Sequence, residues 1–441
     1  MNNRRDENVG MWMRWVGDMS AITTFLLNKS WFSPWALPKA LNSILRAIGN
    51  VAFSNNPISG AMILAAMFVG NPTVAWACLL AGVIGIVFGK VLKQPEALIN
   101  DGLVSFNGIL VGCISVAVFP SLTGHDIDAK FWAILALFLV ISSYVDIGLN
   151  AIMSPCRIPA LSVPFNITAA LMLLSLRGGA GLTGTHLPDP QHDTADLTID
   201  TNTTETMQQE EEDVQWLKVM EGTLLAAGQV YGVGTIDSSI LVYLAFLLFS
   251  PLLTIFFYMG SVIGTVAGVF LCEAPYTAVY QGLWGYNSLL TSGAMVYFLV
   301  PTPSALLAAV VGSVLAVVVQ AASSHIFVAM TVPVLSYPFN VASLLLLAIS
   351  TTTENPALLW TPIKTFPEKH LFIHLINRRQ QVKKTAGEKG NNNDVQKTRE
   401  EEEEDARKTL EENRIILLTP QQLDALLSTK SPQTLPGHGQ S

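Results

Sequence analysis

The chain has 441 residues, of which 50% are hydrophobic and only 13% charged, about half the charged share of a soluble protein. Its net charge of −8 comes mostly from two polar segments, whereas a nucleic-acid-binding protein would need a basic surface. No Lys or Arg occurs between Lys218 and Lys364, which excludes a single soluble core and indicates a bundle of transmembrane helices.

The first 39 residues are predicted to form a cytoplasmic N-terminal segment without a cleaved signal peptide, because residues 1–22 lack a basic start followed by an apolar core and a cleavage site. Ten apolar segments follow, and each is predicted to be helical. They are residues 57–70, 72–89, 103–120, 131–153, 158–177, 238–250, 251–271, 282–300, 304–329 and 334–352. Segments 57–70 and 238–250 are shorter than a full span of ~20 residues, so we expect each to extend into the stretch before it.

One nine-residue cassette occurs twice, as Ile158–Asn166 (IPALSVPFN) and Val332–Asn340 (VPVLSYPFN). Two prolines five residues apart prevent a regular helix between them. Irregular backbone at membrane depth is tolerated only where it is buried in protein or lines a wet cavity. The cassette therefore indicates a pathway through the bilayer.

Three further motif pairs occur in the same order as the two cassettes. The pairs are Gly49-Asn50-Val51 with Gly228-Gln229-Val230, Val83–Gly89 with Val262–Gly268, and Gly102–Leu110 with Gly282–Leu290. The two members of each pair lie 179, 179 and 180 residues apart, respectively, and the two cassettes lie 174 residues apart. The chain is therefore predicted to consist of two homologous halves, a first transmembrane repeat at 40–177 and a second at 223–352.

The predicted fold is all-α and polytopic, with about ten transmembrane helices in two five-helix repeats around a central pore. An odd number of spans in each repeat means that the second repeat enters the membrane inverted relative to the first. Such repeats place a binding site near the bilayer midplane, at their interface.

Positive charge sets the predicted orientation, because Lys and Arg favour the cytoplasmic side. Basic residues gather on one side together with the C-terminal segment: Arg4, Arg5, Arg14, Lys90, Lys93 and Arg157. We therefore expect a multi-pass plasma-membrane protein whose N- and C-termini are cytoplasmic. Residues 178–222 would form an acidic extracellular loop with a glycosylation acceptor at Asn202. Residues 353–441 would form a solvated, partly disordered cytoplasmic tail.

No pattern of residues points to an enzyme. There is no HExxH motif and no GxSxG motif that opens a helix, and the four cysteines are scattered without metal-ligand spacing. We expect no catalytic residue, no metal and no cofactor.

Asp146 is the ionisable residue best placed inside a predicted span, and an ion or proton site is the usual role of such a residue. The alternatives are a carboxylate satisfied by nearby Ser or Tyr hydroxyls and one that lies near a helix end. The corresponding stretch of the second half, around Gln320, has no acid. For Asn107 and Asn287, hydrogen bonding to irregular backbone is favoured over facing the path.

The residues predicted to line the pore carry oxygen acceptors and flat apolar rings but no charge. They are Asn50, Phe53, Ser162, Phe165, Gln229, Ser336 and Phe339. An ion would lose hydration there without meeting an opposite charge. The expected solute is therefore small, polar and neutral.

At these residues the chain resembles the urea transporters, a family of passive urea channels of animal and bacterial membranes. The resemblance covers about residues 40–365. Its motifs are Asn55-Asn56-Pro57-Ile58-Ser59-Gly60, the two Gly-Leu-x-x-aromatic-Asn motifs, Gly228-Gln229-Val230-Tyr231-Gly232 and both Pro-x-x-Ser-x-Pro-Phe cassettes.

The resemblance implies a homotrimer in membrane lipid with one urea pore in each protomer. It places acceptors near the pore mouths at Asn50 and Gln229 and hydroxyls at the constriction at Ser162 and Ser336. The chain departs from the family pattern at three of these positions. Asn50 stands where Gln is usual, and both serines stand where Thr is usual, which predicts a slightly wider and more polar constriction.

The function predicted from these observations is facilitated, uncoupled passage of urea. The alternative is a secondary transporter of a small neutral solute driven by H⁺ or Na⁺ through Asp146. A membrane scaffold or receptor that acts through the C-terminal tail is a third class.

Overall fold

The computed structural model describes residues 16–181, 213–272, 274–351, 357–361 and 365–387. The described residues up to Trp360, together with Thr365–Leu371, form one compact unit, and the other described residues belong to a second. Within the described residues the second unit contributes chiefly the later part of helix α17 (Pro367–Gly387). The described residues are helical apart from turns and a single β-bridge between Leu299 and Trp360, which confirms the predicted all-α class.

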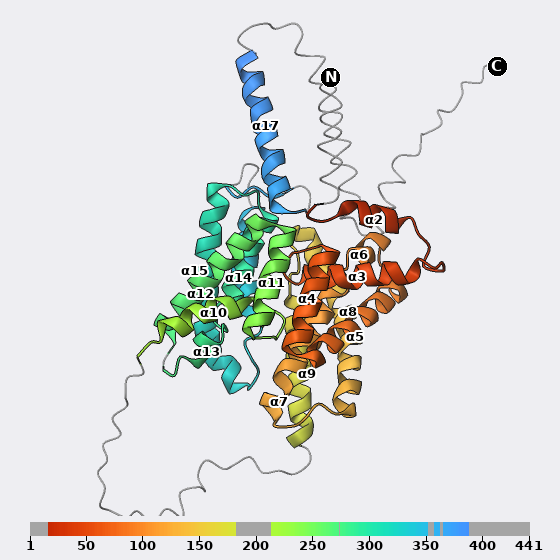
Figure 1. The fold of residues 1–441 in the computed structure, drawn as a ribbon, viewed down its shortest axis with the longest axis vertical. Helices are drawn as coiled ribbons and strands as arrows, with labels where there is room; N and C mark the ends of the chain where they lie inside the picture. The colour runs from red at the N-terminus through yellow and green to blue at the C-terminus, as the bar shows by residue number, and fades with distance from the viewer. Residues whose placement is uncertain (1–15, 182–212, 273, 352–356, 362–364, 388–441) are drawn as a thin grey trace, which may run out of the picture. The chain divides into compact units, whose positions relative to one another are not determined.

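The helices of the first unit follow one another in two comparable series (Figure 1). After α2 (Ser20–Leu27), the first series is α3 (Ala36–Asn50), α4 (Pro57–Gly70), α5 (Pro72–Val91), α6 (Glu96–Asn100), α7 (Phe106–Thr123), α8 (Ala129–Met153), the 3₁₀ turn η2 (Ser154–Cys156) and α9 (Val163–Gly181). The second is α10 (Trp216–Gln229), α11 (Ile236–Phe249), α12 (Pro251–Leu271), α13 (Thr277–Tyr280), α14 (Tyr286–Phe298), α15 (Pro303–Ala329) and α16 (Tyr337–Ile349).

Each predicted apolar segment coincides with one of these helices within a few residues. Among the described residues, five are long and apolar enough to cross a membrane by length and composition, namely α5, α7, α8 with η2, α12 and α15. Four others, α4, α9, α11 and α16, are shorter apolar helices. The structure therefore has the composition of a multi-pass membrane protein.

Asparagine, serine and threonine caps followed by proline set several helix starts. The side chain of Asn56 accepts hydrogen bonds from the backbone N–H groups of Ile58 and Ser59 at the start of α4. Asn71 before Pro72, Ser250 before Pro251 and Thr302 before Pro303 cap α5, α12 and α15 in the same way. Such residues accept hydrogen bonds from N–H groups that the first helical turn leaves unpaired. Proline at the next position has no backbone N–H that would need a partner.

The expectation that the first apolar segment of each half extends backwards is wrong. Helix α3 ends at Asn50 and α10 ends at Gln229, and each is separate from the helix that follows it. The chain turns between them through Phe53, with φ 58°, in the first half and Gly232, with φ 72°, in the second. A left-handed residue at each turn redirects the chain, so the two stretches form distinct helices.

Left-handed residues recur at matching positions of the two series. Besides Phe53 and Gly232, the pairs are Gly102 with Gly282, Arg157 with Thr331, and Leu161 with Leu335. For a bulky residue such as leucine this conformation is costly by about 1 kcal/mol. Its occurrence at both cassette leucines means that surrounding contacts hold the cassettes in place.

Close packing between α12 and α14 depends on glycine. A Cβ atom at Gly264 would lie 2.7 Å from the carbonyl oxygen of Trp284, and one at Gly260 would lie 2.4 Å from that of Ser288. These glycines therefore allow the two helices to pack closely, as small residues let backbones approach in membranes.

We expect Gly264→Ala to lower the thermal midpoint of the purified protein, because the new methyl group must push two backbones apart at about 1–3 kcal/mol. Gly148→Ala in α8 is the matched control, since a Cβ there meets nothing within 4 Å. That variant should be neutral or stabilising, because alanine favours helix. Equal midpoints for both variants would contradict the packing role of Gly264.

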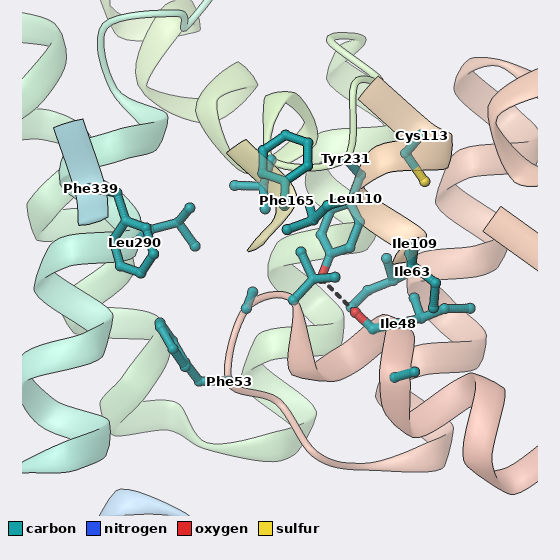
Figure 2. Close-up of a cluster of buried hydrophobic side chains, with 14 of the residues drawn as sticks. Ile48, Phe53, Ile63, Ile109, Leu110, Cys113, Phe165, Tyr231, Leu290 and Phe339 are labelled. Atoms are coloured by element: carbon teal, nitrogen blue, oxygen red, sulfur yellow. Dashed lines mark hydrogen bonds between the residues drawn. The ribbon is translucent and has the colours of Figure 1, made fainter. Parts of the chain in front are cut away.

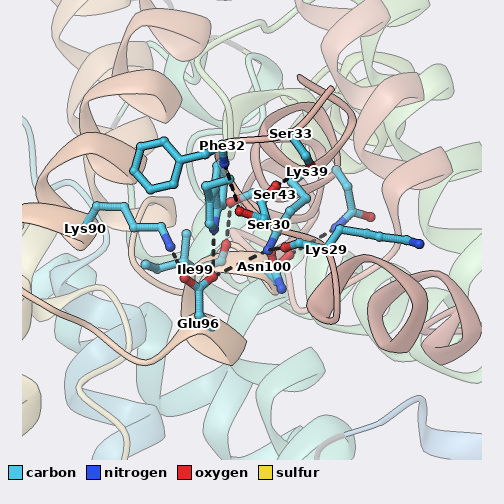
Figure 3. A network of polar contacts seen from close by, with 12 residues as sticks. Lys29, Ser30, Phe32, Ser33, Lys39, Ser43, Lys90, Glu96, Ile99 and Asn100 are labelled. Atoms are coloured by element: carbon cyan, nitrogen blue, oxygen red, sulfur yellow. Dashed lines mark hydrogen bonds and ion pairs between the residues drawn. The ribbon is translucent and has the colours of Figure 1, made fainter. Parts of the chain in front are cut away.

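The described part of the N-terminal segment folds onto α3 and α6 through a buried lysine (Figure 3). The Lys39 side chain is 1% exposed, and its ammonium group donates to the Lys29 carbonyl oxygen at 2.7 Å and lies 3.6 Å from the Glu96 carboxylate. Lys90 pairs with the same carboxylate, and both ammonium groups lie over the Trp31 ring. The carboxylate and the ring compensate the burial of the Lys39 charge.

The predicted tail at 353–441 needs a correction, because residues 357–360 and 365–371 belong to the first unit. Leu358 and Phe366 are buried, and Trp360 stacks on Phe298 at a centroid distance of 5.6 Å. Glu368 accepts hydrogen bonds from Ser250 Oγ at 2.7 Å and from the Leu252 N–H at 2.8 Å. A carboxylate is stabilised at the start of α12 by the N–H groups and the helix dipole, so this stretch packs against the helices of the first unit.

The predicted acidic loop at 178–222 is shorter than expected at both ends, since α9 continues to Gly181 and α10 begins at Trp216. Asn202 lies outside the described residues.

Candidate functional site

The two cassettes meet at their serines. Ser162 directly precedes α9, and Ser336 is the residue before the first turn of α16. The hydroxyl oxygens of Ser162 and Ser336 lie 2.6 Å apart and share a hydrogen bond. Both side chains are buried, so residues 174 positions apart in the sequence form one polar centre inside the protein.

Each serine is held by an asparagine of the other cassette. Asn166 donates to Ser336 Oγ at 3.0 Å and accepts from the Ser336 N–H at 3.1 Å. Asn340 donates to Ser162 Oγ at 3.1 Å and accepts from the Ser162 N–H at 3.1 Å. The four side chains form a reciprocal network in which all partners are uncharged.

Sequence reasoning did not assign Asn166 and Asn340 to the site. A signal was present, since each asparagine follows Pro-Phe at the same place in both cassettes. Nothing in the sequence says, however, that these amides cross over to the opposite serine. That contact follows from the meeting of α9 and α16.

Aromatic rings lie one helical turn beyond the serines. Phe165 and Phe339 follow Ser162 and Ser336 by three residues and are almost fully buried. The Phe53 ring lies 6.2 Å from that of Phe339 and stacks on Tyr297 at 5.3 Å. Phe53 and Phe339, from different halves, are therefore brought together.

Phe165 belongs to a different group of side chains. Figure 2 shows Phe53, Leu290 and Phe339 on one side of the view, and Phe165 near Leu110 and Tyr231. Tyr231 is buried, and its hydroxyl donates to the Ile48 carbonyl oxygen at 3.1 Å. This bond ties the turn after α10 to α3.

Asn50 and Gln229 make matching contacts in the two halves. The amide nitrogen of Asn50 donates to the Asp101 carbonyl oxygen at 2.6 Å, and that of Gln229 donates to the Gln281 carbonyl oxygen at 2.9 Å. The side-chain oxygens, which accept hydrogen bonds, are not used in these contacts. Each amide is thus fixed by its nitrogen, at the end of α3 or α10.

Asp146 in α8 hydrogen-bonds to amides, and the alternative that Ser or Tyr hydroxyls satisfy it is wrong. Its carboxylate accepts from Asn107 at 2.7 Å and from Asn150 at 3.1 Å. Asn107 also donates to the Leu161 carbonyl oxygen at 3.3 Å, and Asn287 donates to that of Leu335 at 3.2 Å. The favoured interpretation of both asparagines as partners of irregular backbone is confirmed.

Among the described residues, no group of three or more His, Cys, Asp or Glu side chains could hold a metal ion. The partners of the two cassette hydroxyls are each other and the amides of Asn166 and Asn340. A centre of this composition can exchange hydrogen bonds with a neutral polar molecule.

The apolar helices and the polar centre between two broken segments define a multi-pass membrane protein. Comparison with known proteins shows which family of membrane proteins this is. The urea transporter family profile matches residues 41–351. Urea transporter 1 of Ovis aries is 30% identical over 380 residues, which cover 83% of this chain and 91% of the relative. Urea transporter 1 of Rattus norvegicus is 29% identical over 379 residues, which cover 83% of this chain and 90% of the relative.

The chain belongs to the urea transporter family. The resemblance stated from the cassettes and the accompanying motifs is confirmed, and so is the prediction of a urea transporter rather than an enzyme.

Proposed function

We propose that the chain lets urea cross the plasma membrane passively, through a path between the two cassettes. Urea would meet the amide oxygens of Asn50 and Gln229 at the two mouths. Between them it would pass the rings of Phe53, Phe165 and Phe339 and the hydroxyls of Ser162 and Ser336. The observation that carries the proposal is the uncharged hydroxyl pair at 2.6 Å, built from both halves.

The charge at the centre favours a neutral solute. Helices α9 and α16 begin at the serine pair, and the N-terminal end of a helix carries partial positive charge. A cation would be repelled there, and an anion would find no Lys or Arg among the partners of the hydroxyls. A neutral molecule loses the least hydration energy.

Urea suits the site because it is planar and carries both hydrogen-bond donors and an acceptor. Flat rings can cover its apolar faces, while hydroxyl and amide oxygens replace water at its N–H edge. To pass the serines, urea must replace the bond between the two hydroxyls with bonds to itself. Because hydroxyls donate and accept, this exchange leaves no polar group unpaired.

The proposed architecture is two inverted five-helix repeats, 40–177 and 223–352, with the site at their interface. Three observations support it: the matching order of helices, the matching left-handed residues and the reciprocal bonds between the cassettes. The proposal includes a homotrimer in membrane lipid with one pore in each protomer. The termini would be cytoplasmic, the loop between α9 and α10 extracellular with glycosylation at Asn202, and the chain from Phe372 onward a cytoplasmic tail.

Urea flux into proteoliposomes tests the proposal. We expect the purified protein to accelerate uptake of labelled urea, with saturation only at high concentration because tight binding would slow exit. Uptake should be unaffected when H⁺ and Na⁺ gradients are collapsed. Flux no faster than that of empty liposomes would overturn the proposal, and loss of flux on gradient collapse would indicate a coupled transporter instead.

A further inference from the structure

The two halves hold the residue before each serine with the same hydrogen bond. Leu161 precedes Ser162, with φ 49°, and Leu335 precedes Ser336, with φ 54°. The amide of Asn107 donates to the Leu161 carbonyl oxygen, and the amide of Asn287 donates to that of Leu335. These bonds hold a costly left-handed backbone, which places the serine that follows.

Each of these asparagines is in turn held by a side chain of the next long helix. Asn107 donates to Asp146 Oδ1 at 2.7 Å, and Asn287 donates to Gln320 Oε1 at 3.1 Å. Asp146 and Gln320 lie 174 residues apart, the same offset as the cassettes. The first half therefore holds its asparagine with a carboxyl group, and the second half holds the equivalent asparagine with an amide.

What the two supporting residues share is an acceptor oxygen, not a charge. Gln320 is neutral, accepts from Asn287, and donates to the Leu283 carbonyl oxygen at 2.9 Å. Asp146 accepts from Asn107 and is steadied by the amide of Asn150. Both side chains are buried in the protein. The requirement common to both halves is thus an oxygen that fixes the rotamer of the asparagine.

We propose that Asp146 and Gln320 are positioning residues for the permeation path. Each fixes an asparagine, the asparagine fixes the left-handed leucine, and the leucine places the serine hydroxyl of the constriction. The inference rests on the proposed function, in which urea passes Ser162 and Ser336. It assigns Asp146 a role in setting the distance between the hydroxyls, and hence selectivity, without ion coupling.

Flux through matched variants tests this assignment. Asp146→Asn keeps the acceptor without the charge and should conduct urea within about twofold of the unmodified protein. Asp146→Leu and Gln320→Leu remove the acceptor, and each should lower urea flux about tenfold, the effect of one lost buried hydrogen bond. Both leucine variants should also change the flux ratio of thiourea to urea, which a general loss of folded protein would leave constant. Size-exclusion profiles would check folding. If Asp146→Leu does not fold, Gln320→Leu still tests the loss of the acceptor, in the second half.

A readout independent of flux separates this inference from the proposed function. In the double variant Ser162→Cys with Ser336→Cys, the two thiols should form a disulfide under mild oxidation, detected by mass spectrometry of the linked peptides. Adding Asp146→Leu should slow cross-linking severalfold, whereas adding Asp146→Asn should not. If the unmodified protein showed no urea flux, the proposed function would be wrong, but the positioning role would still be tested by the cross-linking. Asp146→Asn behaving like Asp146→Leu, or leucine variants with unchanged cross-linking and selectivity, would overturn the positioning role.

Discussion

Urea flux should fall at least about tenfold when Ser162 or Ser336 is replaced by valine. The hydroxyl–hydroxyl bond of 2.6 Å is lost, and the remaining serine and the asparagine of the opposite cassette lose a partner. Leaving a buried polar group unpaired costs about 1–3 kcal/mol, and each 1.36 kcal/mol added to the barrier slows passage tenfold. Valine also adds apolar volume where urea would pass, so both effects reduce flux. Proteoliposome uptake at equal protein content is the measurement.

Ser162→Thr and Ser336→Thr are the matched controls, because they keep the hydroxyl and add only a methyl group. We expect them to retain urea flux and to lower thiourea flux, since the sulfur makes that analogue larger. Valine variants that conduct urea as well as the threonine variants would show that the hydroxyls do not contact the solute. The serines would then only support the ends of α9 and α16.

Replacing Arg46 with leucine should destabilise the whole first unit. Arg46 in α3 is 1% exposed and donates to backbone oxygens of the N-terminal segment, Asp18 at 2.8 Å and Met19 at 3.3 Å. It also donates to the carbonyl and side-chain oxygens of Asn55, at 2.9 and 2.8 Å, and to Asn42 Oδ1 at 3.1 Å. Only the guanidinium fork offers five donors in this arrangement.

Loss of Arg46 leaves several buried oxygens without a donor, at about 3 kcal/mol or more in total. We expect the thermal midpoint of the purified Arg46→Leu protein to fall by about 5 °C or more, and its yield to fall with it. Lys93→Leu is the control, since Lys93 is exposed and should leave the midpoint unchanged. Arg46→Lys should recover only part of the loss, because one ammonium group cannot reach all these oxygens. A midpoint equal to that of the control would mean that the N-terminal segment does not depend on Arg46.

Much of the helical framework could be predicted because it depends on local properties of the chain. Apolar length predicts the helices, while prolines such as Pro57 and Pro72 mark their starts. The turn that separates α3 from α4 was missed, because a left-handed Phe53 has no local signal in the sequence. Residues 357–360 and 365–371 were assigned to a solvated tail for a similar reason. The chain after Thr353 is polar on average, but Leu358 and Phe366 are buried and Glu368 caps α12, contacts that no local pattern announces.

The candidate site shows the same division. Internal repetition was enough to single out Ser162, Ser336 and the two cassette phenylalanines, since two copies of one broken motif are visible without a structure. The crossing of Asn166 and Asn340 to the opposite serines was not visible. Hydrogen bonds between residues about 170 positions apart depend on how the halves meet, and the sequence carries no pattern for that.

Asp146 illustrates the limit most clearly. By sequence it was a carboxylate inside a span, and an ion-coupling site was a reasonable hypothesis. The bond from Asn107 to Asp146 and the equivalent bond from Asn287 to Gln320 instead support our proposal that Asp146 positions an asparagine beside the cassette. The sequence by itself determined that this is an all-helical membrane protein with a duplicated, uncharged cassette, because hydropathy, proline and repetition are local or additive properties. Only the tertiary structure decided which oxygens and amides pair, because hydrogen bonding depends on distances of about 3 Å between atoms far apart in the chain.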